Sequence, residues 1–428
     1  MRTGLLCVLA ASCSWMPAVS APASTPLQAV PAAGAGRTTL VIYDAPAKPF
    51  SLVNELSPLM LMLSRFDTKV VTRQAAEATE ADIRNAEYIV VAGMCGVPRL
   101  NPAAAAALAK TDKPLLAIGW ATALAGAPPV QRNPLALPNA VVPYRNIKWK
   151  LPIDPYFPGP AKPGVALATP DGGSRPLIWR SGERFGFGAL PGAAPLARML
   201  SDFLLDFYGV GKPPAGGLFF AIQNFHPGSD AGAFRRMVDY LYARGNRFVV
   251  STQIEGVPGG ENLMPRETFL DALKYAQAHG GQVILRGAVA SSATPAAFSG
   301  AGLAPIGWEL PDGGGNEPPA SVVQDRSGCL LGNLLADPDE TGSPFPADTI
   351  LFSREGRTVL PLNVNPPTGA SDNLRMVAEN VTQIAALRDG VAGVAVPAWL
   401  PFQQMRDIVD AARSAGMENL SIERMTTK

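Results

Sequence analysis

The chain has 428 residues, of which 47% are apolar and 17% are charged, so it can bury one large core or two medium ones without help from disulfides. Lysine plus arginine (36) nearly balances aspartate plus glutamate (35), and no basic cluster is interleaved with aromatic residues, which argues against a nucleic-acid partner. The 42 glycines and 42 prolines are scattered among apolar runs, as is typical of a globular protein with many ordered loops.

The first 21 residues are typical of a bacterial secretory signal peptide. A charged start at Arg2 is followed by an apolar stretch over residues 5–11, and small residues precede Ala21. A lipoprotein signal that ends at Cys13 is the alternative, although the branched apolar residue usual three positions before the cysteine is missing. We therefore expect a periplasmic or secreted protein. No later segment has about eighteen uninterrupted apolar residues, so we expect no transmembrane helix after signal removal.

Only two cysteines remain after the predicted signal, Cys95 and Cys329. They lie far apart in the sequence, so no disulfide framework is indicated. We expect both to be small buried hydrophobic residues, the commonest fate of a free cysteine.

Residues 22–37 are rich in alanine, proline and glycine and predict a flexible leader. Residues 38–124 then alternate between predicted strands and helices. The strands are apolar without period-two polarity, which favours a parallel sheet covered on both faces, and so a flavodoxin-like doubly wound domain. The predicted strands are 39–43, 69–72, 88–92 and 114–118, and the predicted helices are 52–63, 79–85 and 102–110.

Residues 125–211 are dense in proline and glycine and predict a β-rich insert with a linker helix. Short extended pieces are expected at 141–149, 165–169 and 177–179, and the helix at 197–208. The boundary of the next domain is expected near residue 212.

Residues 212–428 again alternate between strands and helices and predict a (β/α) barrel, distorted from regularity. The working groups of such a barrel lie at the carboxyl ends of its strands. One helix is expected to begin at Asp230 and to end at Gly245. The other predicted elements are strands 218–222, 248–252, 283–285, 349–352 and 393–396, and helices 266–279, 374–384 and 402–415.

The first predicted barrel strand ends in a polar cluster, Gln223-Asn224-Phe225-His226-Pro227-Gly228-Ser229-Asp230. The run over residues 218–254, with this cluster and the Tyr-Leu-Tyr-Ala-Arg-Gly before the next strand, resembles the opening of a little-characterised branch of the polysaccharide deacetylase superfamily (carbohydrate esterase family four and relatives). The resemblance covers residues 216–424, about half of the chain. It implies a distorted barrel of polysaccharide deacetylase type, and a flavodoxin-like domain also precedes the barrel in that branch.

The resemblance implies a metal-dependent N-deacetylase, in which one acidic residue is the general base while a second acidic residue and two histidines hold a divalent metal such as zinc. This sequence departs from each motif. Gln223 and Asn224 match the acidic pair, Arg286 and Ala290 match the histidines of the family's His-Gly-x-x-His run, and the region around Trp399 has no match for a late histidine. An amide is no general base and a guanidinium is no practical metal ligand.

The histidine count leads to the same expectation without the family. The chain holds two histidines, His226 and His279, and His279 lies at a predicted helix end, where imidazole favours the helix dipole and water. We therefore expect no metal cofactor. A divalent metal such as zinc is expected only if an unconventional deacetylase site exists.

The strand ends define a candidate glycan-binding site, or the degenerate remnant of a catalytic one. Amides and a guanidinium bind sugar hydroxyls, and indole rings stack on pyranose rings. The alternative is that Arg286 pairs with Glu309 or Asp230 to fill a former active site, and that the tryptophans belong to the core. The candidate residues are Gln223, Asn224, His226, Asp230, Arg286, Trp308, Glu309 and Trp399.

Two further residues follow strands of the first predicted domain. Cys95, in Gly93-Met94-Cys95-Gly96, resembles the nucleophile of amidotransferase-like domains, but no histidine is present nearby in the sequence to activate it, so a buried structural thiol is favoured. Asp44 either has a functional role or caps the turn that follows it.

Three functions stay open. The first is an exported deacetylase-like protein without metal-dependent catalysis that binds a polysaccharide or oligosaccharide and assists exopolysaccharide synthesis machinery. The second is an active deacetylase, or another carbohydrate hydrolase that uses carboxylates such as Asp230, Glu255 or Glu309. The third is a scaffold whose first domain docks a membrane synthase.

Overall fold

The computed structural model describes the chain over residues 36–44, 68–129, 134–173, 175–191, 194–213, 216–253, 263–286, 298–309, 329–331, 351–352, 358–366 and 372–420, with a few single residues between 56 and 66. The predicted signal peptide, Cys13, nearly all of the predicted leader, most of the helix predicted at 52–63, Glu255 and Ala290 lie outside these residues. Among the described helices, none is long and apolar enough to cross a membrane.

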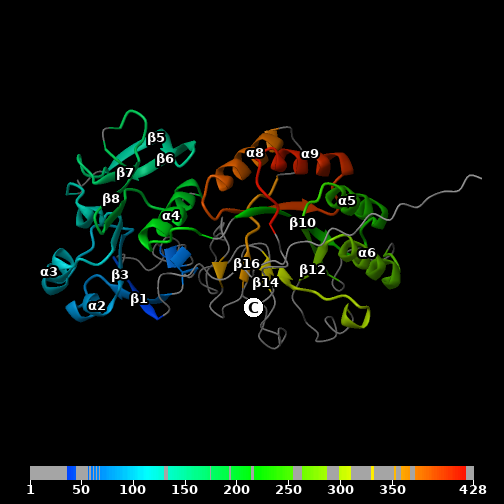
Figure 1. The fold of residues 1–428 in the computed structure, drawn as a ribbon, viewed down its shortest axis with the longest axis horizontal. Helices are drawn as coiled ribbons and strands as arrows, with labels where there is room; N and C mark the ends of the chain where they lie inside the picture. Colours follow the sequence, from blue (N-terminus) through cyan, green and yellow to red (C-terminus); the bar gives the residue numbers. More distant parts are fainter. Residues whose placement is uncertain are drawn as a thin grey trace, which may run out of the picture.

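The first sheet, which includes the labelled strands β1, β3, β7 and β8 of Figure 1, has seven described strands in the order β2-β1-β3-β4-β9-β8-β7. Strands β1 (Arg37–Tyr43), β2 (Thr68–Gln74), β3 (Tyr88–Gly93), β4 (Leu115–Gly119) and β9 (Arg184–Phe187) pair in parallel. Apolar side chains are buried on both faces, as the unbroken apolar runs predict. Helices α2 (Glu80–Asn85) and α3 (Pro102–Lys110) contribute to the core on one face and α4 (Ala194–Phe207) to the core on the other.

The segment after β4 is rich in strands, as its composition predicts. Strands β7 (Val165–Ala168) and β8 (Ile178–Ser181) join β9 to extend the first sheet, with antiparallel pairing. Strands β5 (Leu135–Tyr144) and β6 (Ile147–Tyr156) form a separate hairpin, so the single extended piece predicted at 141–149 is wrong. The turn falls at Arg145, which adopts φ +55°, and the sequence gives no glycine to mark it.

The second sheet has the order β15-β16-β14-β13-β12-β11-β10-β17, in which every pair except β15 with β16 is parallel. An isolated parallel bridge between Val364 and Val394 joins the chain after β16 to β17, so the parallel strands curve into a barrel-like array. The bounds are β10 (Gly217–Phe225), β11 (Phe248–Thr252), β12 (Gly281–Arg286), β13 (Gly307–Glu309), β14 (Cys329–Leu331), β15 (Leu351–Phe352), β16 (Thr358–Leu360) and β17 (Val391–Pro397).

In the described part of the second half, four helices pack outside these strands (Figure 1). Asp230 accepts hydrogen bonds from the backbone N–H groups of Gly232 and Ala233 and so begins the first helix, and Gly245, with φ +66°, follows its end, as predicted. The helices are α5 (Ala231–Ala243), α6 (Arg266–Ala278), α8 (Asp372–Ala385) and α9 (Phe402–Arg413).

Alternation along the barrel strands separates an inner core from an outer one. On β10, Phe219 and Ala221 belong to the inner cluster, whereas Phe220 and Ile222 belong to the outer cluster beneath the helices. Because side chains alternate along a strand, the residue two positions after the last inner-core residue of each strand also faces inward, at the carboxyl end of that strand. On β10 that position is Gln223, on β11 Ser251, on β12 Arg286 and on β13 Glu309.

Candidate site at the carboxyl end of the barrel strands

A β-bulge interrupts β10 at the predicted polar pair. The pairing with β11 passes from Ile222–Val250 to Phe225–Thr252, so three steps along β10 match two along β11. Within the bulge Asn224 adopts φ +59°, a left-handed conformation that asparagine tolerates better than other residues with a side chain. Bulges and such strained residues are frequent beside functional sites, because they re-aim side chains.

Five polar side chains form a hydrogen-bonded cluster here, which we call the carboxyl-end network: Gln223, Asn224, Ser251, Arg286 and Glu309. One carboxylate oxygen of Glu309, Oε1, accepts from Gln223 Nε2 at 2.5 Å. Its other oxygen, Oε2, accepts from the Ser251 hydroxyl. Arg286 donates through Nη1 to the side-chain oxygen of Asn224, and the same nitrogen lies 3.6 Å from Glu309 Oε1.

The charged groups of this network are largely buried, so they need partners. The side chain of Glu309 is 1% exposed and that of Arg286 is 17% exposed. A buried carboxylate is tolerated only when it is paired and hydrogen-bonded, and Glu309 is both. The alternative pairing considered from the sequence, Arg286 with Glu309, is therefore present, whereas Asp230 caps α5.

His226 and Asp230 lie in the turn that follows β10. The ring nitrogen Nδ1 of His226 accepts from the backbone N–H of Gly228 at 3.0 Å, and partial burial lowers the pKa of the imidazole. The backbone N–H groups of Ala233 and Gly232 lower the pKa of Asp230. Both side chains thus have local roles in the β10–α5 turn.

The two tryptophans differ in environment. Trp308 is 7% exposed and packs in the outer core between sheet and helices, as the alternative interpretation expected. Trp399 is 61% exposed and lies two residues after the end of β17. Its neighbour Ala398 donates its backbone N–H to the carbonyl of Gln223 at 2.8 Å, which places Trp399 one residue from a contact with the carboxyl-end network.

Ser251 was not among the site residues predicted from the sequence. The same rule that selected the other residues could have found it, because Ser251 and Thr252 are the polar end of an otherwise apolar strand. His279, by contrast, lies at the end of α6 as predicted, with Nδ1 2.7 Å from the carbonyl oxygen of Tyr275.

Asp44 and Cys95 meet at the carboxyl edge of the first sheet. The Asp44 carboxylate accepts from the backbone N–H groups of Met94 and Cys95, each at 2.8 Å, so it caps the loop after β3. Cys95 is exposed, and the prediction of a buried thiol is wrong for this residue. The reason is that Met94 takes the buried position of this capped loop, whereas Cys329 lies buried in the inner barrel core as predicted.

Across the described residues, no group of three or more His, Cys, Asp or Glu side chains is placed to hold a metal ion. No family model and no curated protein matches the chain. Among solved structures, it aligns with phospho-2-dehydro-3-deoxyheptonate aldolase (DAHP synthase) from Thermotoga maritima at 12% identity and a TM-score of 0.29, covering 48% of this chain and 72% of that one. It also aligns with tryptophan synthase from M. tuberculosis in its aminoacrylate-bound form, at 11% identity and a TM-score of 0.26, covering 46% and 93%. Similarity at this level does not bear on what the chain does.

Proposed function

We propose that the chain is an exported, periplasmic or secreted protein related to the polysaccharide deacetylases, which binds a cell-surface or exopolysaccharide glycan without metal-dependent catalysis. In this proposal the first half is a flavodoxin-like domain and the second half a distorted deacetylase-type barrel. The strand order β2-β1-β3-β4-β9 and the bridged parallel array of the second sheet support that assignment. The glycan is handed to, or received from, an exopolysaccharide synthesis machinery.

The observation that carries the proposal is the carboxyl-end network beside an exposed indole. Gln223 and Asn224 offer amides, Arg286 offers a guanidinium, and Trp399 offers an open aromatic face at the adjacent strand end. Amide and guanidinium groups hydrogen-bond sugar hydroxyls, and an indole face stacks on a pyranose ring. The carboxyl end of the strands is also where a barrel places its ligand.

The donor set does not fit a hydrolytic divalent cation. The two oxygens of its single carboxylate, Glu309, already accept from Gln223 and Ser251. A guanidinium lies beside that carboxylate at 3.6 Å, where a metal would face a permanent positive charge. The proposed function therefore involves no metal at this position.

Isothermal titration of the full chain with N-acetylated and de-N-acetylated oligosaccharides tests the proposal. Wild type is expected to bind at least one series, and Trp399→Ala is expected to weaken that binding roughly tenfold, through loss of about 1.4 kcal/mol of stacking. Tyr242→Ala is the matched control, because Tyr242 is also an exposed aromatic residue (56%) but lies on the last turn of α5.

Two results would overturn the proposal. One is no binding of either series by the wild-type protein. The other is stoichiometric zinc by elemental analysis together with release of acetate from the acetylated series, which would favour the alternative of an active deacetylase with an unconventional site.

A further inference from the structure

The loop between α8 and β17 is held by the first half of the molecule through three consecutive residues. Leu387 packs into the apolar cluster of the first half. Arg388 donates hydrogen bonds to the side chain and the backbone carbonyl of Asp202 on α4. Asp389 forms an ion pair at 2.9 Å with Arg65, and the two side chains are 7% and 1% exposed. Each of these contacts joins segments far apart in the sequence.

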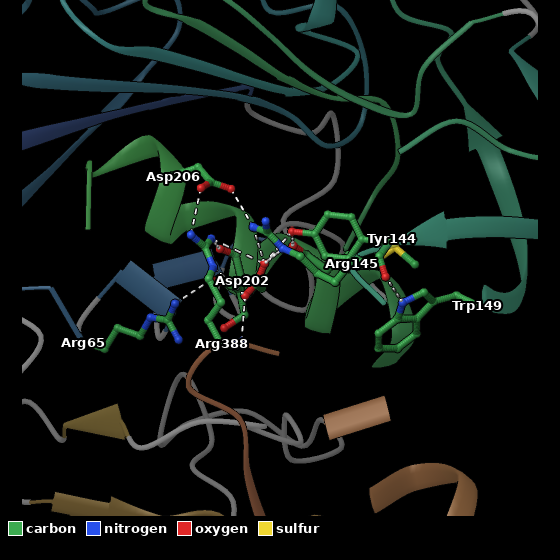
Figure 2. Close-up of polar contacts among 9 residues, drawn as sticks. Arg65, Tyr144, Arg145, Trp149, Asp202, Asp206 and Arg388 are labelled. Atoms are coloured by element: carbon green, nitrogen blue, oxygen red, sulfur yellow. Dashed lines mark hydrogen bonds and ion pairs between the residues drawn. The ribbon is translucent and has the colours of Figure 1, made fainter. Parts of the chain in front are cut away.

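Arg388 belongs to a closed ring of four charges, the ion-pair ring of Arg145, Asp202, Arg388 and Asp206 (Figure 2). Asp202 accepts from Arg145 Nε at 2.7 Å and from Arg388 Nε at 3.1 Å. Asp206 accepts from Arg145 Nη2 at 2.7 Å and from Arg388 Nη1 at 2.8 Å. The hydroxyl of Tyr144 donates to Asp202 at 2.7 Å. Each guanidinium therefore bridges both carboxylates.

The ring remains charged although Asp202 is fully buried. Burial alone would raise the pKa of Asp202, but the neighbouring guanidinium groups of Arg388 and Arg145 outweigh it and lower the pKa below its ordinary value. Arg145, which has the positive φ in the β5–β6 turn, is also part of this ring, since its side chain bonds to both aspartates.

The face of α4 that carries the ring also contacts α8. Arg198, Asp202 and Asp206 are spaced four residues apart, so they lie on one stripe of the helix. Arg198 donates through Nη1 to Asn380 at 3.2 Å and to Gln383 at 2.7 Å. Thus one helix of the first half holds both α8 and the loop that follows it.

From this loop β17 runs to the candidate site without a break. At Gly390 the backbone packs closely against the end of α8, because a Cβ there would collide with the carbonyl oxygen of Ile384. β17 then pairs with β10 from Gly217–Val391 to Gln223–Pro397. The strand ends two residues before Trp399. The position of the loop therefore sets where the far end of β17 lies against β10.

We propose that the first half acts as a clamp on β17: the ion-pair ring and the Arg65–Asp389 pair fix the amino end of this strand and thereby place Trp399 beside Gln223. The clamp makes the two halves one mechanical unit, whereas domains joined by small interfaces usually move relative to one another. Only its effect on ligand affinity rests on the proposed function. Its effect on β17 does not.

Hydrogen–deuterium exchange of the full chain, followed by mass spectrometry, tests the clamp. In Arg388→Ala, amides of residues 391–400 and 217–225 are expected to exchange at least about threefold faster than in wild type. Arg375→Ala is the matched control, because Arg375 forms an exposed pair with Glu379 on α8 at 3.7 Å, and no change is expected there.

Arg388→Lys covers the case in which Arg388→Ala does not fold by circular dichroism. Lysine keeps the charge but cannot bridge two carboxylates with a planar fork, so an intermediate acceleration over the same two segments is expected. Faster exchange confined to α4 and the β5–β6 hairpin, with β17 unchanged, overturns the clamp. The exchange readout decides this even if no oligosaccharide binds the wild-type protein, and if one does, Arg388→Lys is expected to weaken its binding without a change at the contacting residues.

Discussion

The most direct test of the carboxyl-end network is Glu309→Ala. The substitution leaves two buried donors, the Gln223 amide and the Ser251 hydroxyl, without the acceptor that each uses now. Each unsatisfied buried donor costs about 1–3 kcal/mol, and Arg286 also loses a partner at 3.6 Å. Because such losses are not additive within one cluster, we expect the free energy of unfolding to fall by about 3–4 kcal/mol in total, within the range of roughly 3–5 kcal/mol for breaking a buried pair.

Urea unfolding followed by far-ultraviolet circular dichroism measures this loss, provided that the dependence on urea stays unchanged. Glu309→Gln keeps one acceptor oxygen and is expected to lose about half as much. Glu379→Ala removes a carboxylate from an exposed pair and is expected to change stability by less than about 0.5 kcal/mol. A loss below about 1 kcal/mol for Glu309→Ala would refute the view that this carboxylate organises the strand ends.

Three further predictions follow from single residues. Asn224→Gly and Asn224→Ala both remove the acceptor used by Arg286, so these two variants differ only in how well they tolerate the left-handed φ of this position. In urea unfolding, Asn224→Ala is therefore expected to be less stable than Asn224→Gly by about 1–2 kcal/mol. Native Cys95 is expected to react with iodoacetamide at neutral pH while Cys329 stays unlabelled by mass spectrometry, since burial raises the pKa of Cys329 to about 12. The ion pairs lower the pKa of Asp202, so the ionised carboxylate stabilises the fold at any pH above the ordinary carboxyl pKa. This stabilisation is lost as the pH falls through the lowered pKa. The difference in unfolding free energy between wild type and Asp202→Asn is therefore expected to shrink from neutral pH to about pH 3.

Elements with a capping signal or an unbroken apolar run could be predicted from the sequence, and three of the shortest strands could not. Helix α3 has the predicted bounds because Asn101 caps it and a proline opens it. Strand β11 is an unbroken apolar run, and its bounds also agree. Strands β13, β14 and β16 have three residues each, too few to show any periodicity, and none was predicted. Their place in the sheet is set by neighbours distant in sequence.

Predicted strand ends identified Gln223, Asn224 and Arg286 of the carboxyl-end network, because the carboxyl ends of parallel strands meet at one edge. Glu309 was also a candidate, although no strand was predicted at its position. The same rule could not foresee the β-bulge that turns Asn224 toward Arg286. The ion-pair ring gave no sequence signal at all, since Asp202 bonds to Arg145 and Arg388, which lie 57 and 186 positions away. Ion pairs between residues so far apart in the sequence depend on the tertiary fold and cannot be predicted without it.

The two charge clusters, the ion-pair ring and the carboxyl-end network, differ in geometry. In the ion-pair ring each guanidinium approaches both carboxylates at 2.7 to 3.1 Å, which is the geometry that repays the cost of burying charge. In the carboxyl-end network the neutral side chains of Gln223 and Ser251 donate to Glu309. The Arg286 guanidinium lies further from this carboxylate, at 3.6 Å, and donates to Asn224, which has a positive φ. The positive φ of Asn224 and the 3.6 Å separation between Arg286 and Glu309 therefore distinguish this network from the ring at the opposite end of β17.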